Sequence, residues 1–581
     1  MPIIEGLVNR AIKRVERALS PLPDWANTIR DESNWWKLSQ PQWAELLKKD
    51  SDLWKASKER AKKGPKILMA TGVGGFPTVT IVDSLLAVAL TLRGAEVHIL
   101  LCDKFLPACS MTARGFFPIA EEFVKHGPST SLCKVCFSPG DRMFRSLGLP
   151  VHRFSDFVSD EERENSRQLS GGVQIHEIPS YCLDGVPAGE HAYSGALRYF
   201  ARGDLEGEPQ GEAILRRYLD ASILTVYGLR RLLRTWSFEA SCFIHGIYVP
   251  HGVIPAVCRQ EKVRSVSWSH TYRKHTFIFS HEDTYHHTML VEPASNWENM
   301  KWTAECEAEI VDYLKSRWYG TRDWISYADN VRGKELDVSA ELGVDFSKPC
   351  IGMLTNVIWD AQVNYRNNAF PNMLEWVLQT IRYFVERPDL QLILRAHPAE
   401  LRHGIKSRQF IVDEIRREFP DLPKNIILIG PENPISTYAV MMKCDSVLIW
   451  ATNAGIELAG MSIPIIVAGE AWIKNKGVTL DANSAEEYFD FLKRLPIGER
   501  MDDATTLKAR KYAYHYFFRR MIPLGFLQPS KHSIFYDLKI GGLDDLMPGR
   551  SVGLDVICKG ILSGEEFNYP AELVREDFDE R

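Results

Sequence analysis

Apolar runs and amphipathic stretches alternate along most of this chain, as parallel α/β sheets require. The run over 66–72 predicts a buried strand, which is followed by a glycine-rich turn, a helix over 79–94 and a strand over 95–102. The alternation returns from Lys348 onward, with strands predicted over 350–354, 390–395, 425–429, 447–450 and 463–467 and helices between them. This order predicts an α/β fold with two Rossmann-like, doubly wound parallel sheets.

The chain divides into five predicted parts. At 581 residues it is too long for a single core, so several domains are expected. They are an N-terminal helical segment (1–65), an N-terminal Rossmann-like domain (66–290), a helical connector (291–345), a C-terminal Rossmann-like domain (346–500), and a C-terminal helix and tail (501–581).

The first helix has two interpretations. Over 2–20 the apolar residues fall on one face and the basic residues lie off it, until Pro21 stops the helix. Such a helix either packs on the protein's own body or lies on an anionic membrane surface.

Composition narrows the class of protein. With 45% hydrophobic and 25% charged residues the chain is typical of a globular protein, and its net charge of −5 argues against a dedicated nucleic-acid binder. No apolar run reaches membrane-spanning length, and residues 1–20 lack the apolar core of a signal peptide. We expect a cytoplasmic protein, peripheral to the inner membrane if the membrane interpretation of 2–20 holds.

Four cysteines form the most metal-like pattern of the chain. Cys102 ends a predicted strand, Cys109 follows seven residues later, and Cys133 and Cys136 form a CxxC pair. A CxxC turn brings two sulfurs together, and two further thiolates would complete a site for zinc or a 4Fe-4S cluster. A redox CxxC pair and unligated buried thiols are the alternatives.

Histidines gather where the later strands of the first sheet end. His245 lies in a strand predicted over 241–247, His251 follows it, and His270 and Arg273 come after a strand over 264–268. Open α/β sheets bind ligands at the carboxyl ends of their strands. We therefore predict that these four side chains contact a ligand or an acceptor.

Polar side chains also follow three strands of the second sheet. They are Thr355 and Asn356, then Arg395 and His397, which Pro398 follows, and finally Thr452 and Asn453. Asn453 is predicted to cap a helix whose N–H groups, together with the Arg395 cation, suit a phosphate. Glu457, in the first turn of that helix, is predicted to accept a hydrogen bond from a ribose hydroxyl.

These motifs resemble a known family. LRAHPAE (394–400), CDSVLIWATNAGIELAGMSIPIIVAG (444–469) and KGVTLDANSAEEYFDFL (476–492) resemble bacterial capsule and surface-polysaccharide biosynthesis glycosyltransferases of the GT-B type, including relatives that use CMP-activated acidic sugars. The resemblance covers roughly 346–490 and is weaker at 240–280. It implies two Rossmann-like domains that face a cleft, with His397, Pro398, Thr452 and Asn453 holding the nucleotide and its phosphate.

The resemblance also implies a mechanism. The donor would be a CMP- or UDP-type nucleotide sugar and the acceptor a glycan or glycolipid. Arg395 and His397 would stabilise the leaving phosphate, and no metal is needed for that role. The N-terminal domain would supply a general base for an inverting transfer, with His270 as first choice and Asp103 and Glu282 as alternatives.

Three other functions stay open. A sugar-nucleotide 2-epimerase would use the same phosphate-binding domain but needs no acceptor. A non-enzymatic, metal-stapled scaffold of a polysaccharide assembly complex would bind no nucleotide. The cysteines would in a third case hold a redox cluster with a regulatory role.

Overall fold

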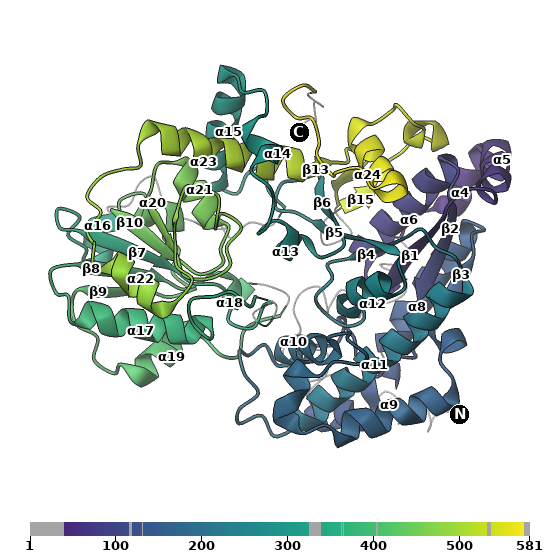
Figure 1. The fold of residues 1–581 in the computed structure, drawn as a ribbon, viewed down its shortest axis with the longest axis horizontal. Coiled ribbons are helices and arrows are strands. Elements are labelled where there is room, and N and C mark those ends of the chain that lie inside the picture. Colours follow the sequence, from purple (N-terminus) through teal and green to yellow (C-terminus); the bar gives the residue numbers. More distant parts are fainter. Residues whose placement is uncertain are drawn as a thin grey trace, which may run out of the picture.

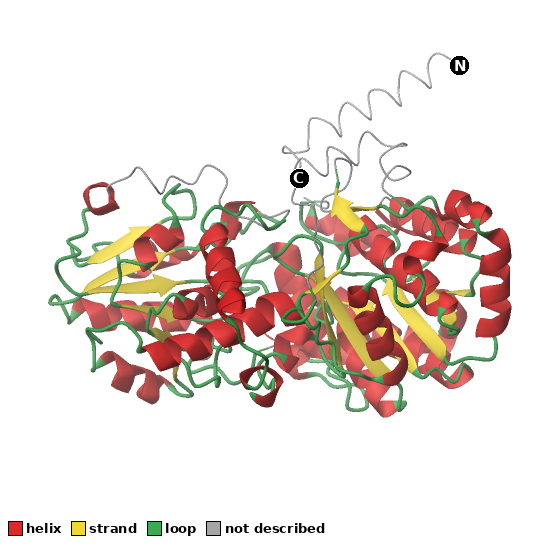
Figure 2. Cartoon of the chain, turned by 90° about the horizontal axis from the view of Figure 1, so that it is seen from above, coloured by secondary structure: helices red, strands yellow, loops and turns green. Residues whose placement is uncertain are grey.

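Two α/β lobes lie side by side, each built around one sheet (Figures 1 and 2). The computed structural model describes residues 40–115, 119–130, 132–324, 338–361, 363, 365–402, 405–530 and 536–574. Two largely parallel sheets with helices around them confirm the predicted fold class. The helix predicted over 2–20 lies outside the described residues.

The N-terminal sheet has seven strands in the order β13-β6-β5-β4-β1-β2-β3. Strands β1 to β5 are parallel, whereas β6 and β13 add an antiparallel edge. The strands are β1 (Lys66–Gly72), β2 (Glu96–Leu101), β3 (Val151–Arg153), β4 (Ala240–Ile244), β5 (Arg264–His270), β6 (Thr276–His281) and β13 (Ile522–Pro523). Alternate residues of β1 enter separate cores on the two faces, Ile67 and Met69 on one and Leu68 and Ala70 on the other.

Helices cover both faces of this sheet. They are α4 (Trp43–Lys49), α5 (Ser51–Ala61), α6 (Pro77–Leu92), α7 (Ala120–His126), α8 (Leu132–Ser146), α9 (Asp160–Gly172), α10 (Ala188–Phe200), α11 (Gly211–Thr235) and α12 (Ile254–Gln260), with short 3₁₀ turns η1 (Gly127–Thr130), η2 (Phe154–Phe157), η3 (Ile175–Ser180) and η4 (His251–Val253). All sixteen residues of α6 are buried, because α5 and α24 (Val552–Ser563) pack on it from outside. A helix that is apolar around its whole circumference suits this position.

The C-terminal sheet has six parallel strands in the order β12-β11-β10-β7-β8-β9. They are β7 (Cys350–Leu354), β8 (Gln391–Arg395), β9 (Ile426–Ile429), β10 (Ser446–Ile449), β11 (Ile465–Val467) and β12 (Leu480–Asp481). The helices around them are α16 (Val338–Leu342), α17 (Met373–Val385), α18 (Ala399–Arg402), α19 (Ile411–Glu418), α20 (Thr437–Met441), α21 (Ala454–Gly460), α22 (Ala485–Leu492) and α23 (Asp503–Tyr514). The connector between the lobes carries α13 (Tyr285–Thr288), α14 (Ser295–Glu298) and α15 (Ala304–Arg317).

After α23 the chain returns to the N-terminal lobe. A π-helical turn, η6 (His515–Arg520), leads to β13, to the hairpin β14 (Leu527–Pro529) and β15 (Tyr536–Leu538), and then to η7 (Leu543–Leu546) and α24. Figure 1 shows α24 beside α6, on the lobe where the chain began. The first lobe is therefore completed by residues from the far end of the sequence.

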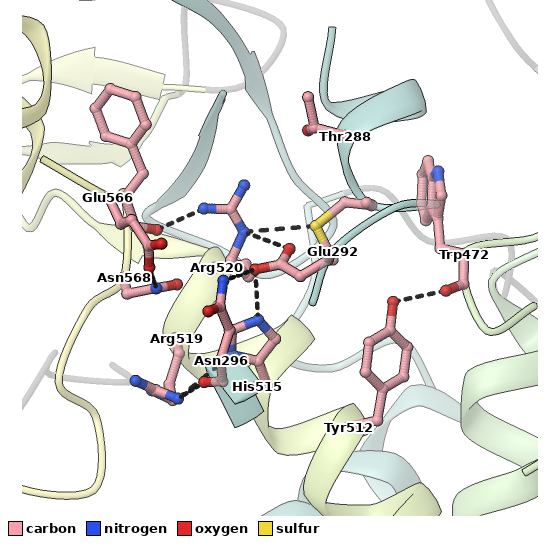
Figure 3. Close-up of polar contacts among 12 residues, drawn as sticks. Thr288, Glu292, Asn296, Trp472, Tyr512, His515, Arg519, Arg520, Glu566 and Asn568 are labelled. Carbon is pink, nitrogen blue, oxygen red and sulfur yellow. Dashed lines mark hydrogen bonds and ion pairs between the residues drawn. The ribbon is translucent and has the colours of Figure 1, made fainter. Parts of the chain in front are cut away.

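A buried ion cluster ties the two crossings between the lobes together (Figure 3). From η6, Arg520 and His515 approach the carboxylate of Glu292, at 3.2 and 3.0 Å. Burial opposes ionisation, but these two partners lower the pKa of Glu292 to about 2. Glu292 belongs to the outgoing connector and η6 to the returning segment, so the cluster fixes both segments where they pass.

Two predicted elements differ from the structure. The strand predicted over 241–247 ends at Ile244, because His245 and Gly246 take positive φ values of 65° and 81° and turn the chain away. The final helix changes to π geometry at His515. In the described part of the chain, no helix is long and apolar enough to cross a membrane.

Candidate active site

A cleft of about 330 Å³ lies between the lobes, and strand ends of both sheets contribute to its lining. The N-terminal lobe contributes His245 after β4 and His270 at the end of β5. The C-terminal lobe contributes all eight of the site residues that were predicted in it, hereafter the polar-wall residues. They are Thr355, Asn356, Arg395, His397, Pro398, Thr452, Asn453 and Glu457. A cleft of this volume suits a small polar ligand.

The turn between β10 and α21 presents Thr452 and Asn453 to the cleft. The Thr452 hydroxyl accepts the N–H of Ala454 at 3.3 Å, whereas the Asn453 side chain makes no capping bond. Asn453 therefore occupies the predicted N-cap position of α21, but its side chain makes no capping bond. Its Nδ2 is buried without a hydrogen-bond partner among the described residues, so it can donate to a bound group.

Arg395 and His397 are both held by backbone groups. Arg395 is 5% exposed and donates to the carbonyls of Gly430 and Asn433, at 2.5 and 2.9 Å. Its guanidinium therefore braces the loop after β9, and its charge reaches the cleft from a fixed position. The N–H of Ala399 donates to Nδ1 of His397 at 3.1 Å, so a neutral His397 carries its hydrogen on Nε2 and can donate from there.

Glu457 has partners within the protein on both of its oxygens. Nε of Arg317 pairs with one oxygen at 2.9 Å, and the Tyr438 hydroxyl donates to the other. Arg317 also pairs with Asp323. Although burial opposes its charge, the two carboxylates raise the pKa of Arg317. The ion pair holds α21 against α15, and the contact of Glu457 with a ribose hydroxyl stays a prediction.

A comparison with protein-family models bears on this wall of the cleft. Residues 309–505 match the model described as "Capsule polysaccharide biosynthesis protein". This segment is similar to capsule polysaccharide biosynthesis proteins. The resemblance predicted from the motifs is confirmed, and the matched range, hereafter the capsule-synthesis segment, contains all eight polar-wall residues.

A comparison with solved structures gave matches of low identity, two of which are described here. The beta Kdo 2,4 transferase of Thermosulfurimonas dismutans KpsC is 12% identical, over 47% of this chain and 79% of that chain, with a TM-score of 0.32. The S. aureus MnaA–UDP structure is 10% identical, over 77% of this chain and 91% of that chain, with a TM-score of 0.28. A search of curated proteins found no match.

Histidines face the capsule-synthesis segment from the N-terminal lobe. The ring of His245 lies 5.6 Å from that of Tyr248 and 5.2 Å from that of His286. Burial lowers the pKa of His245 to about 4, so it is neutral at pH 7. His286 bonds through Nδ1 to the Tyr365 hydroxyl at 2.9 Å. His270 lies in the same wall, and its role as base stays a prediction.

Other predicted contacts point elsewhere. His251 is 3% exposed and bonds through Nε2 to a β1 carbonyl at 2.9 Å, and Arg273 donates to an η6 carbonyl at 2.8 Å. Neither belongs to the described lining of the cleft, so these two predictions are wrong. The alternative bases, Asp103 and Glu282, also lie outside that lining, and Asp103 accepts a backbone N–H of Ser155 at 3.2 Å.

The sequence analysis missed two features of the cleft. Asp360, in the loop after β7, accepts the Tyr248 hydroxyl at 2.6 Å, and this bond joins the two lobes. Trp318 and Tyr438 place their rings at an interplanar angle of 11° with centroids 6.2 Å apart. The only sequence signal for Asp360 was its position soon after a strand. No local sequence pattern predicts that Trp318, just after α15, and Tyr438, in α20, lie against each other.

The four predicted cysteines lie outside the capsule-synthesis segment, around a second and smaller cavity. Cys102 and Cys109 come from the loop after β2, and Cys133 and Cys136 from α8. Among the described residues, no three His, Cys, Asp or Glu side chains are close enough to hold a metal ion, so the predicted coordination sphere is not formed here. Burial raises the pKa of Cys109 to about 12, which keeps it a neutral thiol at pH 7 unless a cation compensates.

Proposed function

We propose that this protein is a glycosyltransferase that moves a sugar from a nucleotide-activated donor to a growing surface polysaccharide or glycolipid. The observation that supports this proposal most directly is the composition of the cleft. The capsule-synthesis segment forms one wall with polar groups from three strand ends, and the N-terminal α/β sheet forms the other. Ligand sites form preferentially between domains and beyond strand ends. Opposed walls allow donor and acceptor to be held separately.

The donor phosphate is assigned to the C-terminal wall. Asn453 has an Nδ2–H without a partner among the described residues, His397 lies in the lining beside it, and Arg395 supplies a fixed positive charge nearby. Donors fixed before the reaction stabilise the charge that develops on a leaving phosphate. Helix α21 has only seven residues, so side chains are given the larger part of this role. We extend the proposal to a CMP- or UDP-type donor.

The acceptor is assigned to the N-terminal wall, with His270 as general base. A histidine is suited to this role because its ordinary pKa lies close to neutral pH. The Tyr248–Asp360 bond between the lobes would close the cleft around bound donor and limit its hydrolysis by water. Should His270 prove dispensable, Asp360 in the lining of the cleft is the carboxylate candidate.

Nucleotide binding is tested first. A thermal-shift screen with CMP, UDP, GDP and dTDP should single out one nucleotide, which at a hundred times its dissociation constant adds about 2.7 kcal/mol to the free energy of unfolding. The nucleotide sugar with that base is then incubated with and without an oligosaccharide acceptor. Transfer that requires acceptor supports the proposal, whereas conversion of the donor alone indicates a 2-epimerase and no nucleotide binding indicates a scaffold.

The role of His397 is tested by His397→Ala. Loss of one preorganised donor should lower kcat by about 10²–10³-fold. The matched control is His176→Ala, which removes an exposed histidine on the N-terminal lobe. Unchanged transfer by His397→Ala would refute this arrangement of the donor wall.

A further inference from the structure

Two aromatic rings in the lining of the cleft lie almost parallel. Trp318, just after α15, and Tyr438, in α20, make an interplanar angle of 11° with their centroids 6.2 Å apart. Both residues are half-buried. We propose that these two rings form the surface on which the base of the nucleotide donor stacks. This inference rests on the proposed function and names the part of the site that binds the base.

Neither ring covers the whole face of the other. Carbon atoms in optimal contact lie about 3.5–4.0 Å apart, so parallel rings that covered each other fully would have their centroids at about that distance. The observed 6.2 Å leaves part of each face uncovered by its partner. The bases of nucleotides are flat rings that stack on aromatic side chains. The uncovered faces therefore suit a base better than they suit a charged group.

A buried ion pair fixes both rings in place. Nε of Arg317, the residue before Trp318, pairs with Glu457 at 2.9 Å, and the Tyr438 hydroxyl donates to the same carboxylate. The guanidinium of Arg317 also lies over the ring of Tyr272, 5.1 Å from its centroid. Since Glu457 is only 2% exposed, water competes little for these bonds. Rings that are held before binding lose little conformational entropy when a ligand stacks on them.

Helices α20 and α21 join this aromatic surface to the groups assigned to the phosphate. Asn453 is the N-cap of α21 and Glu457 lies four residues later, so the two residues lie on one side of the helix about one turn apart. The loop that Arg395 braces leads into α20, which contains Tyr438. A nucleotide has its base and its phosphate on one ribose, so the two subsites must be close neighbours. The structure meets this requirement.

Titration calorimetry of the full chain tests the inference. The ligands are those of CMP, UDP, GDP and dTDP that the wild type binds, together with ribose 5-phosphate, which has no base. Trp318→Ala should weaken nucleotide binding by about 5- to 150-fold, the usual contribution of stacking on one base, and should leave the binding of ribose 5-phosphate unchanged. Trp302→Ala is the matched control, because Trp302 is a half-buried tryptophan just before α15 that lies outside the described lining.

Two further measurements decide the matter if Trp318→Ala fails to fold. Trp318→Phe keeps an aromatic face and should keep most of the affinity. Saturation-transfer NMR on the wild-type chain should saturate the protons of the base more strongly than those of the ribose, because the base lies against the rings.

The outcomes separate this inference from the proposed function. A nucleotide that binds the wild type and Trp318→Ala equally overturns the inference and leaves the proposed function standing. Equal losses of nucleotide and ribose 5-phosphate binding overturn it as well, and so does a base that is saturated no more than its ribose. If none of the four nucleotides binds the wild type, the proposed function and the inference fail together.

Discussion

The carboxyl edge of the N-terminal sheet divides into two halves with different surroundings. At β4 and β5 it carries His245 and His270 and opens into the cleft. At β1 and β2 it carries Gly75 and Cys102 and is covered by α8. The two halves occupy the same topological position, where parallel sheets place their ligand-binding groups.

What covers each half decides the chemistry it can support. The open half keeps imidazoles beside a second lobe, where a substrate can reach them. The closed half is covered by α8, and burial raises the pKa of Cys109 there to about 12, so this thiol is a neutral core group at pH 7. We therefore expect changes in the open half to affect turnover and changes in the closed half to affect stability.

The largest expected effect is on turnover in the open half. His270→Ala should lower kcat by about 10²–10⁴-fold, the usual contribution of a general base, while the melting temperature changes little. Steady-state transfer kinetics and thermal unfolding measure the two effects, with His176→Ala as control. A larger loss in Asp360→Asn than in His270→Ala would move the base to the carboxylate.

The buried ion pair in the wall of the cleft should chiefly affect stability. Arg317→Ala leaves Glu457 and Asp323 buried without their cation, which should cost about 3–5 kcal/mol of unfolding free energy in urea titrations. Arg322→Ala removes an arginine that pairs with Asp312 closer to the surface and should cost at most about 1 kcal/mol. Equal losses in the two variants would mean that burial does not set the strength of these pairs.

Two glycine substitutions test the close packing in the closed half. Gly75→Ala forces α8 away from the turn after β1 and should cost about 1–3 kcal/mol of unfolding free energy. Gly171→Ala, near the end of α9, meets no atom within 4 Å and should be neutral or stabilising by up to about 1 kcal/mol. Urea titration measures both effects, and an equal loss in the two variants would contradict the close packing of α8 on this turn.

The effect expected to be smallest at pH 7 concerns His251, whose contribution to stability changes only as the pH falls. Burial lowers the pKa of His251 to about 4, below the ordinary value of about 6.5 for an unfolded chain. Its contribution to stability is therefore complete above pH 6.5 and is lost as the pH falls toward 4, by at most about 1.4 kcal/mol per pH unit. His251→Asn should reduce this slope in urea titrations between pH 7 and 5, whereas His176→Asn should leave it unchanged.

Strands defined by a short apolar run were predicted well from the sequence. β1 and β7 have the predicted bounds, since buried parallel strands need only a short β-rich run. The strand before His245 was predicted too long, because a positive φ at a histidine has no clear sequence signal. The crossing of residues after 520 back to the first lobe was not predicted, since it depends on packing against α6.

The sequence by itself determined which chemical groups follow which strand, and hence which residues meet in the cleft and around the thiol cavity. Only the tertiary structure decided which of those groups are already engaged. Arg395 is held by carbonyls 35 and 38 residues away, and Glu457 by a hydroxyl 19 residues away and an arginine on α15. Strand positions follow from local periodicity, whereas hydrogen-bond partners follow from segments that only the folded chain brings together. That distinction leaves Asn453, His397 and His270 as the residues on which the proposed transfer depends.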